Sequence, residues 1–213
     1  MQPHVMLIVG NEQKFLAGIK QFESYVRHEL KLGKRVTRML AAYRKSQEIL
    51  DEIWDAAEKA RRGRSPFVLV YHGHGYPNCF SPNGDDIGYE KLGQVLTDTT
   101  FLFIDDSCYS GSCIDVFTEQ KLLPDFGSVI AAAKSDEETA GGDKFLNDVV
   151  DSFRSKKPFM KKKGRQIAGK LGHTQGPRNA DSFEIAKTAE PRGQIVYESV
   201  RYGKALDYLL FPK

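Results

Sequence analysis

Short apolar runs alternate along the first part of the chain with stretches in which apolar residues recur every three or four positions. The runs have the length and the β-branched or aromatic content of strands that are buried on both faces. A weaker run of the same kind is RVTRMLA (35–41). The strong runs are HVMLIV (4–9), FVLVY (67–71), TFLFI (100–104) and SVIAAA (128–133).

Two stretches between the runs have the period of an amphipathic helix. Residues 12–31 and 46–60 each place apolar side chains at spacings of three and four, and Ser46 is a candidate N-cap for the second helix. The alternation of runs and helices predicts a three-layer α/β domain with a mostly parallel central sheet. Sites in such sheets lie beyond the C-terminal ends of the strands, so the residues that follow the runs are the candidates for a functional site.

The pattern weakens after residue 155. Residues 155–172 are interpreted as a loop followed by a short helix, residues 193–200 as a strand, and residues 205–211 as a docked element of either type. The segment 154–170 has eight basic residues and no acidic one, although the formal net charge of the chain is only +3. This basic strip is a solvated loop, a self-cleavage or autoinhibitory segment, or a surface for nucleic acid or an anionic membrane.

Length and composition set the class of protein. The 213 residues suit one globular domain, and 40% hydrophobic with 28% charged residues is the composition of a folded, soluble chain. No apolar run approaches the roughly 20 residues that cross a bilayer, and the N-terminus lacks the basic segment of a secretory signal. The three cysteines, Cys79, Cys108 and Cys113, are too few for a disulfide framework and indicate a reducing compartment. We therefore expect a cytoplasmic protein.

The segments that follow the second and third strong runs are the richest in reactive side chains. YHGHG (71–75) contains two histidines, and DDSCYSG (105–111) contains a cysteine in a turn of small and polar residues. A helix that begins near Ser110 would direct its N–H groups toward the Cys108 thiol and favour the thiolate. A histidine from the end of a neighbouring strand would complete the activation of this nucleophile.

Together, VLVYHGHG and LFIDDSCYSGS resemble the signature pair of the caspase-like cysteine peptidases, most closely the metacaspase and bacterial caspase-homologue branch. In that branch one strand ends in S-G-H-G and another in D-S-C-H-S-G. The segments 83–96 and 128–145 resemble the family's sequence segments that link and follow these strands. TQGP (174–177) weakly resembles part of a substrate loop of the family. The resemblance implies a caspase-like three-layer α/β/α sandwich, with residues 1–213 as a single peptidase domain in which the basic strip is a loop.

The resemblance also implies a role for each residue of the pair. His74 is expected to protonate the leaving amine and activate water, Cys108 to attack the peptide carbonyl, and the N–H groups of Gly75 and Cys108 to hold the oxyanion. No third acidic residue is required. Asp106 corresponds to an acid of the S1 pocket, and such an acid favours Arg or Lys at P1. The predicted activity is therefore a cysteine endopeptidase that cleaves after a basic residue.

The sequence departs from the family pattern in three places. Tyr109 stands where a histidine is usual, and His72 stands in place of a small residue, where it is interpreted as structural or as part of the cleft rim. The segment between Cys108 and the next run is short, so a long cleavable linker is missing and two-chain maturation is in doubt.

Other functions stay open at this point. His72 and His74 with Cys79 or Cys108 could bind zinc, although the spacing matches no closed structural site. The acidic residues 136–138 leave calcium open as an activator, while no cofactor is expected to be required. A caspase-fold scaffold protein and an amidase for a non-peptide substrate are the alternative functions. We expect a monomer that acts on proteins or peptides and has neither a membrane nor a nucleic acid as its main partner.

Overall fold

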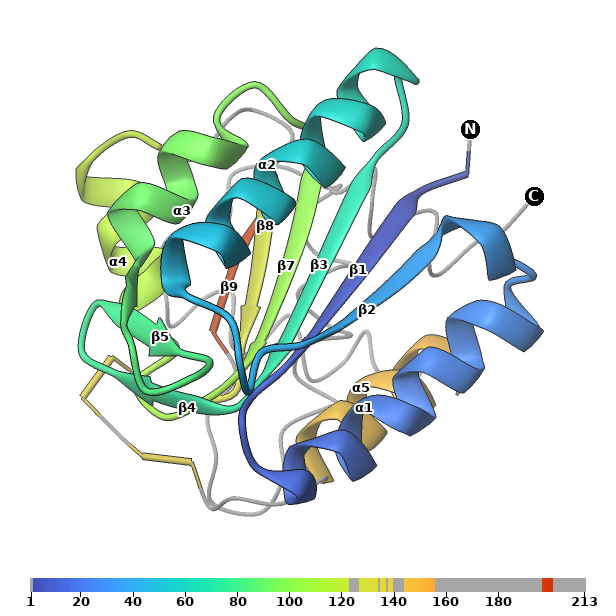
Figure 1. The fold of residues 1–213 in the computed structure, drawn as a ribbon, viewed down its shortest axis with the longest axis horizontal. Helices are drawn as coiled ribbons and strands as arrows, with labels where there is room; N and C mark the ends of the chain where they lie inside the picture. The colour runs from blue at the N-terminus through green and yellow to red at the C-terminus, as the bar shows by residue number, and fades with distance from the viewer. Residues whose placement is uncertain are drawn as a thin grey trace.

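The computed structural model describes residues 2–122, 127–133, 135–136, 138–139, 144–155 and 197–200 (Figure 1). Within these residues, a six-stranded sheet has the order β2-β1-β3-β7-β8-β9. Strands β1, β2, β3, β7 and β8 pair in parallel, and β9 is antiparallel to β8. The strands are β1 (His4–Val9), β2 (Val36–Leu40), β3 (Phe67–His72), β7 (Phe101–Asp106), β8 (Gly127–Ala131) and β9 (Tyr197–Val200). The predicted sheet, mostly parallel, is confirmed, and all five apolar runs form strands.

Helices cover both faces of the sheet. Figure 1 places α1 and α5 on one face and α2, α3 and α4 on the other. A π-helical turn (Tyr25–Glu29) extends α1, and a short 3-10 helix (Gly33–Arg35) precedes β2. The α-helices are α1 (Gln13–Ser24), α2 (Ser46–Arg62), α3 (Tyr89–Leu96), α4 (Ser112–Glu119) and α5 (Lys144–Ser155). The three-layer arrangement is therefore confirmed.

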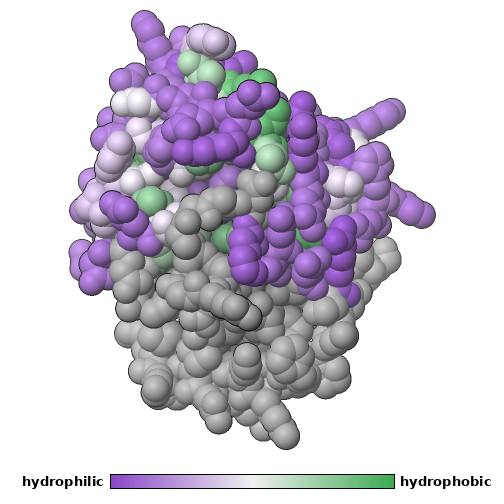
Figure 2. All heavy atoms as spheres, turned by 90° about the horizontal axis from the view of Figure 1, so that it is seen from below, coloured by the Kyte–Doolittle hydropathy of each residue, from purple (hydrophilic) through white to green (hydrophobic). Residues whose placement is uncertain are grey.

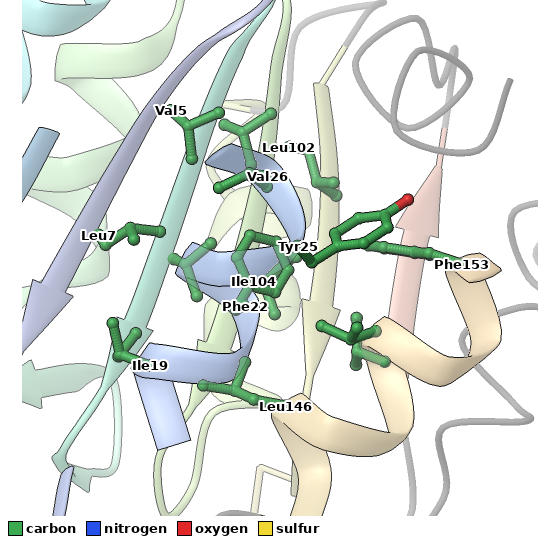
Figure 3. Close-up of a cluster of buried hydrophobic side chains, with 14 of the residues drawn as sticks. Val5, Leu7, Ile19, Phe22, Tyr25, Val26, Leu102, Ile104, Leu146 and Phe153 are labelled. Carbon is green, nitrogen blue, oxygen red and sulfur yellow. The ribbon is translucent and has the colours of Figure 1, made fainter. Parts of the chain in front are cut away.

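The alternation of side chains along each strand divides the core into two layers. Val5, Leu7 and Val9 of β1 belong to the layer under α1 and α5, whereas Met6 and Ile8 belong to the layer under α2, α3 and α4. Figure 3 shows the first layer, in which side chains of α1 and α5 converge on those of the strands. Because both faces are covered, every residue of β3 and β7 is buried, which explains the apolar sequence of residues 67–71 and 101–104.

The sequence prediction is wrong at one helix cap. Ser46 is the first residue of α2 rather than its N-cap, and its hydroxyl donates to the carbonyl oxygen of Asp85. Lys45 precedes the helix, and its N–H donates to the Glu48 carboxylate at 3.2 Å. The carboxylate of the first turn thus replaces the expected serine as the capping group.

A second, antiparallel sheet lies at the end of the central sheet where the parallel strands terminate (Figure 1). Its strands contain only two or three residues each, and the sequence pattern did not predict them. They are β4 (His74–Tyr76), β5 (Cys79–Ser81) and β6 (Ile87–Gly88).

The remaining predictions concern the last third of the chain. The strand expected at 193–200 is confirmed for Tyr197–Val200. The loop and helix expected at 156–172, the TQGP segment and the element at 205–211 lie outside the described residues. No helix among the described residues combines the length and apolarity that are needed to span a membrane.

Candidate active site

The two reactive segments meet at one edge of the central sheet. Strands β3 and β7 are neighbours, and their register pairs His72 with Asp106 at the last position of each strand. The pairing continues past the strand ends, because the N–H of Gly73 donates to the carbonyl oxygen of Asp106 at 3.3 Å. Figure 2 views the molecule from this edge, and the described part of the face is mostly hydrophilic. The segments that contain His74 and Cys108 therefore start from the same place.

The chain turns sharply between β3 and β4, and Gly73 makes this turn sterically possible. The hydroxyl of Tyr71 donates to the carbonyl oxygen of His74 at 2.7 Å. A Cβ at position 73 would lie 2.1 Å from that hydroxyl oxygen, so only glycine leaves room for the hydrogen bond. Tyr71, itself fully buried, thus fixes the backbone that carries His74.

Gly75 packs directly against the cysteine turn. A Cβ at this position would lie 2.3 Å from the carbonyl oxygen of Cys108 and 2.5 Å from Oγ of Ser107. Both separations are shorter than any real Cβ contact, so the two backbones approach as closely as they do only because residue 75 is glycine. This contact brings two predicted site residues, Gly75 and Cys108, together, and His74 directly precedes Gly75 in the chain.

The cysteine turn is connected to its neighbours by hydrogen bonds of serine side chains. Oγ of Ser110 accepts from the N–H of Ala133 at 3.0 Å, just beyond β8. Oγ of Ser112 donates to the carbonyl of Tyr109 and accepts from the N–H of Asn78, in the turn between β4 and β5. The turn is thereby fixed both to the central sheet and to the small sheet that contains His74.

Helix α4 begins two residues later than the sequence predicted, at Ser112 instead of near Ser110. The reason is local: Tyr109 has a φ of +56°, a left-handed conformation that interrupts helical geometry directly after Cys108. The side chain of Tyr109 donates from its hydroxyl to Glu138 at 3.2 Å. The partly exposed Cys108 places its Sγ 3.7 Å from Oγ1 of Thr139, so the segment after β8 approaches the thiol.

His74 contacts an acidic residue that the sequence reasoning did not include. Its Nε2 is hydrogen-bonded to a carboxylate oxygen of Glu12, and the second oxygen of Glu12 lies 2.7 Å from Nζ of Lys14. The hydrogen bond from Lys14, and then that from His74, lower the pKa of Glu12 below its usual value. Glu12 follows β1 by three residues, at the same carboxyl edge as the two motifs. The rule that sites collect at strand ends would have included it had the rule been applied to the first run.

Asp106 and His72 form a buried pair. Nδ1 of His72 lies 2.7 Å from Oδ2 of Asp106, and both side chains are only 4% exposed. The same nitrogen lies 3.4 Å from the backbone carbonyl of Asp106, and the ring of Phe15 packs edge-on against the imidazole with centroids 5.1 Å apart. His72 is thus a packed neighbour of the predicted S1 acid rather than an exposed rim residue.

The preceding residue, Asp105, is fully buried on the opposite side of the sheet. Its carboxylate oxygens accept from the hydroxyls of Ser107 and Tyr89, each at 2.7 Å. Burial raises the pKa of Asp105 to about 7, against the opposing effect of these hydrogen bonds. Through Ser107, the buried carboxyl group orients the residue directly before Cys108.

The other two cysteines lie outside this arrangement. Burial, together with the nearby Asp86, raises the pKa of Cys79 to about 11, and Cys113 is fully buried in the core. Across the described parts of the chain, no three His, Cys, Asp or Glu side chains are grouped so that they could hold a metal ion. In the acidic segment 136–138, which left calcium open as an activator, the carboxylate of Glu138 accepts a hydrogen bond from the Tyr109 hydroxyl.

Comparisons with known proteins identify the fold. No protein-family model matches the chain, and no curated protein matches its sequence. Among solved structures, caspase-1 from Spodoptera frugiperda aligns with a TM-score of 0.60 at 11% identity, over 94% of this chain and 87% of that one. The structure of pro-sf-caspase-1 aligns with a TM-score of 0.51 at 12% identity, over 72% of each chain. The protein therefore has a caspase-like α/β fold, and at these identities the likeness concerns the fold alone.

Proposed function

We propose that this protein is a cysteine endopeptidase in which Cys108 is the nucleophile and His74 the acid–base residue. The observation that carries the proposal is the contact of Gly75 with the backbone of Cys108 and the side chain of Ser107. It joins the two segments that resemble the peptidase signature, at the carboxyl edge of a sheet with the caspase-like order of layers. Sites of α/β proteins occur at this edge.

The chemistry assigned to these residues is acyl transfer through a thioester. The Cys108 thiolate attacks the peptide carbonyl carbon, and the N–H groups of Gly75 and Cys108 are assigned to the resulting oxyanion. The C–N bond breaks as the His74 imidazolium gives its proton to the leaving amine. Water then attacks the thioester while His74 takes a proton from it, and the carboxylic acid and the Cys108 thiol are released.

A basic residue at P1 is the proposed preference, with Asp106 as the acidic wall of the pocket. Asp106 is the last residue of β7 and precedes Cys108 by two residues. A guanidinium would bind it through paired, charge-assisted hydrogen bonds. Because His72 already occupies one carboxylate oxygen, the preference for Arg or Lys over a neutral residue is expected to be moderate.

Fluorogenic peptides that end in Arg, Lys, Leu or Asp test this proposal, in the presence and absence of calcium. The wild type should hydrolyse the Arg and Lys peptides, and Cys108→Ala and His74→Ala should each lose about 1,000-fold or more in kcat/KM. Cys79→Ala is the matched control, because this thiol lies in the small sheet and should leave turnover unchanged. Full turnover by Cys108→Ala would refute the assignment of the nucleophile, whereas a preference for Asp would refute only the assignment of Asp106.

The metacaspase branch, activation by calcium, a monomeric state and a cytoplasmic location remain part of the same proposal. The calcium arm of the peptide assay addresses the second of these. Hydrolysis of a non-peptide amide, with no turnover of any peptide, would favour the amidase alternative.

A further inference from the structure

Glu12 reaches the candidate active site from a third strand end. In the sheet β1 lies beside β3, and the register pairs Val9 with His72, so the residues after β1 emerge next to those after β3. Glu12 stands directly before α1 and contacts Nε2 of His74 with one carboxylate oxygen. Both side chains are 43% exposed, so the contact lies at the surface of the protein and not in the core.

The first turn of α1 confines the His74 ring from a second direction. The ring of Phe15 meets that of His74 edge-on, with centroids 5.0 Å apart and planes at 89°. Phe15 follows Glu12 by three residues, so one short segment supplies both the hydrogen-bond acceptor and the apolar wall. Since Nε2 is occupied by the carboxylate, Nδ1 is the ring nitrogen that is left to exchange protons with the thiol, the leaving amine or water.

We propose that Glu12 is a positioning residue that orients His74 and stabilises its imidazolium form. The proposal rests on the proposed roles of His74 and Cys108 and adds a carboxylate to them. In this role the Glu12 carboxylate would act as does an acid that is hydrogen-bonded to a catalytic histidine. It would hold His74 in one tautomer and favour the cation that forms during proton transfer, without itself contacting the substrate. A glutamate is ionised at neutral pH in any case, and the hydrogen bonds from Lys14 and then from His74 lower the pKa of Glu12 further.

Substitution of Glu12 separates charge from hydrogen bonding. Gln at this position keeps an acceptor for Nε2 and removes the charge, whereas Ala removes both. Glu12 forms no side-chain hydrogen bond that caps α1, so neither change deletes a helix cap. We expect kcat to fall about 10-fold in Glu12→Gln and about 100-fold in Glu12→Ala, with KM within about twofold of the wild type.

Lys14→Gln is the matched control for this series. Lys14 contacts the other oxygen of Glu12 and lies 4.9 Å from the centroid of the Phe15 ring, but its contacts do not include His74. Its replacement should therefore leave kcat within about threefold of the wild type. A merely structural role of the loop would make all three variants alike. In a His74→Ala background, Glu12→Ala should add less than a twofold loss, because a residue that acts through His74 has nothing left to position.

A second readout does not depend on activity. Nitrogen-15 NMR of the histidine side chains in the full chain with Cys108→Ala should show His74 predominantly as the Nε2–H tautomer, and Glu12→Ala should move this signal toward that of a free imidazole. Wild-type kcat in Glu12→Ala together with an unmoved His74 signal would overturn the proposal. If the wild type hydrolyses no peptide but the signal moves, Glu12 still positions His74 and the failure belongs to the proposed peptidase function.

Discussion

Replacing Gly75 by alanine tests the closest contact in the candidate active site. The added methyl group would lie 2.3 Å from the carbonyl oxygen of Cys108, which belongs to the backbone and cannot rotate away. To reach even a 3.0 Å contact, β4 and the cysteine turn must separate by at least about 0.7 Å. The substitution therefore displaces the segment that contains His74 relative to Cys108 without changing the chemical identity of any reactive side chain.

Two effects of Gly75→Ala can be estimated from this displacement. Overpacking of one methyl group costs about 1–3 kcal/mol of unfolding free energy, which lowers the Tm of a chain of this length by roughly 2–12 °C. A misplacement of nearly 1 Å between reacting groups costs about 100-fold in rate. We expect a folded variant with kcat/KM reduced by about that factor.

Gly88→Ala is the control for Gly75→Ala. Gly88 belongs to the same small sheet, and a Cβ there would meet no atom within 4 Å. Thermal unfolding by circular dichroism, peptide hydrolysis, and the rate of Cys108 alkylation by iodoacetamide should all distinguish the two variants. If Gly75→Ala matched Gly88→Ala in Tm, turnover and alkylation rate, the close packing of the two segments would be refuted. The Tm comparison decides the structural part even if no peptide is hydrolysed.

Two further variants test the roles of the consecutive aspartates Asp105 and Asp106. Between about pH 4 and 7 the native Asp105 carboxyl group holds a proton that the unfolded chain releases, because its pKa is raised from 3.8 to about 7; wild-type stability therefore falls as pH rises through this window. Asp105→Asn removes this titration. The unfolding free energy of the variant minus that of the wild type, measured by urea titration, should therefore rise by about 2–3 kcal/mol between pH 5 and pH 8. A difference that does not change with pH would contradict the raised pKa of Asp105. His72→Ser removes the imidazole that lies 2.7 Å from the Asp106 carboxylate, so the ratio of kcat/KM for Arg over Leu peptides should rise about 10-fold. An unchanged ratio in His72→Ser would show that Asp106 does not face the P1 side chain.

The sequence was sufficient to predict the central sheet because burial on both faces imposes an apolar identity on nearly every strand residue. Residues 35–41 were a weaker candidate for the same reason: β2 is an edge strand, and Thr37, Arg38 and Leu40 are exposed. The small sheet was not predictable in this way. Strands of two or three residues are too short for a period. Contacts of Gly75 with Cys108 and of Asn78 with Ser112 also tie the small sheet to a segment that is distant in sequence.

The site was predictable in part, since parallel strand ends meet at one edge whatever the intervening sequence. That rule places the HGHG and DDSC segments together, and the register of β3 with β7 confirms it. The contact of Glu12 with His74 was not predicted, because Glu12 lies 62 positions from His74 in the sequence and has no reactive residue beside it. The pairing of His72 with Asp106 was not predicted for a different reason. His72 was interpreted as a departure from the family pattern and Asp106 as a pocket residue, and only the strand register makes them neighbours.

The consecutive aspartates at the end of β7 show how strand geometry separates two chemically identical side chains. Asp105 follows Phe101 and Phe103 on the face under α2, α3 and α4, where it meets Tyr89 and Ser107. Asp106 follows Leu102 and Ile104 on the face under α1 and α5, where it meets His72. The first carboxyl group is positioned to order the turn before Cys108, and the second stands on the face from which Glu12 and Phe15 approach His74. A one-residue shift of register would exchange these environments. The close contacts at Gly73 and Gly75 disfavour such a shift, and under the proposed function they thereby determine which of the two aspartates faces the substrate.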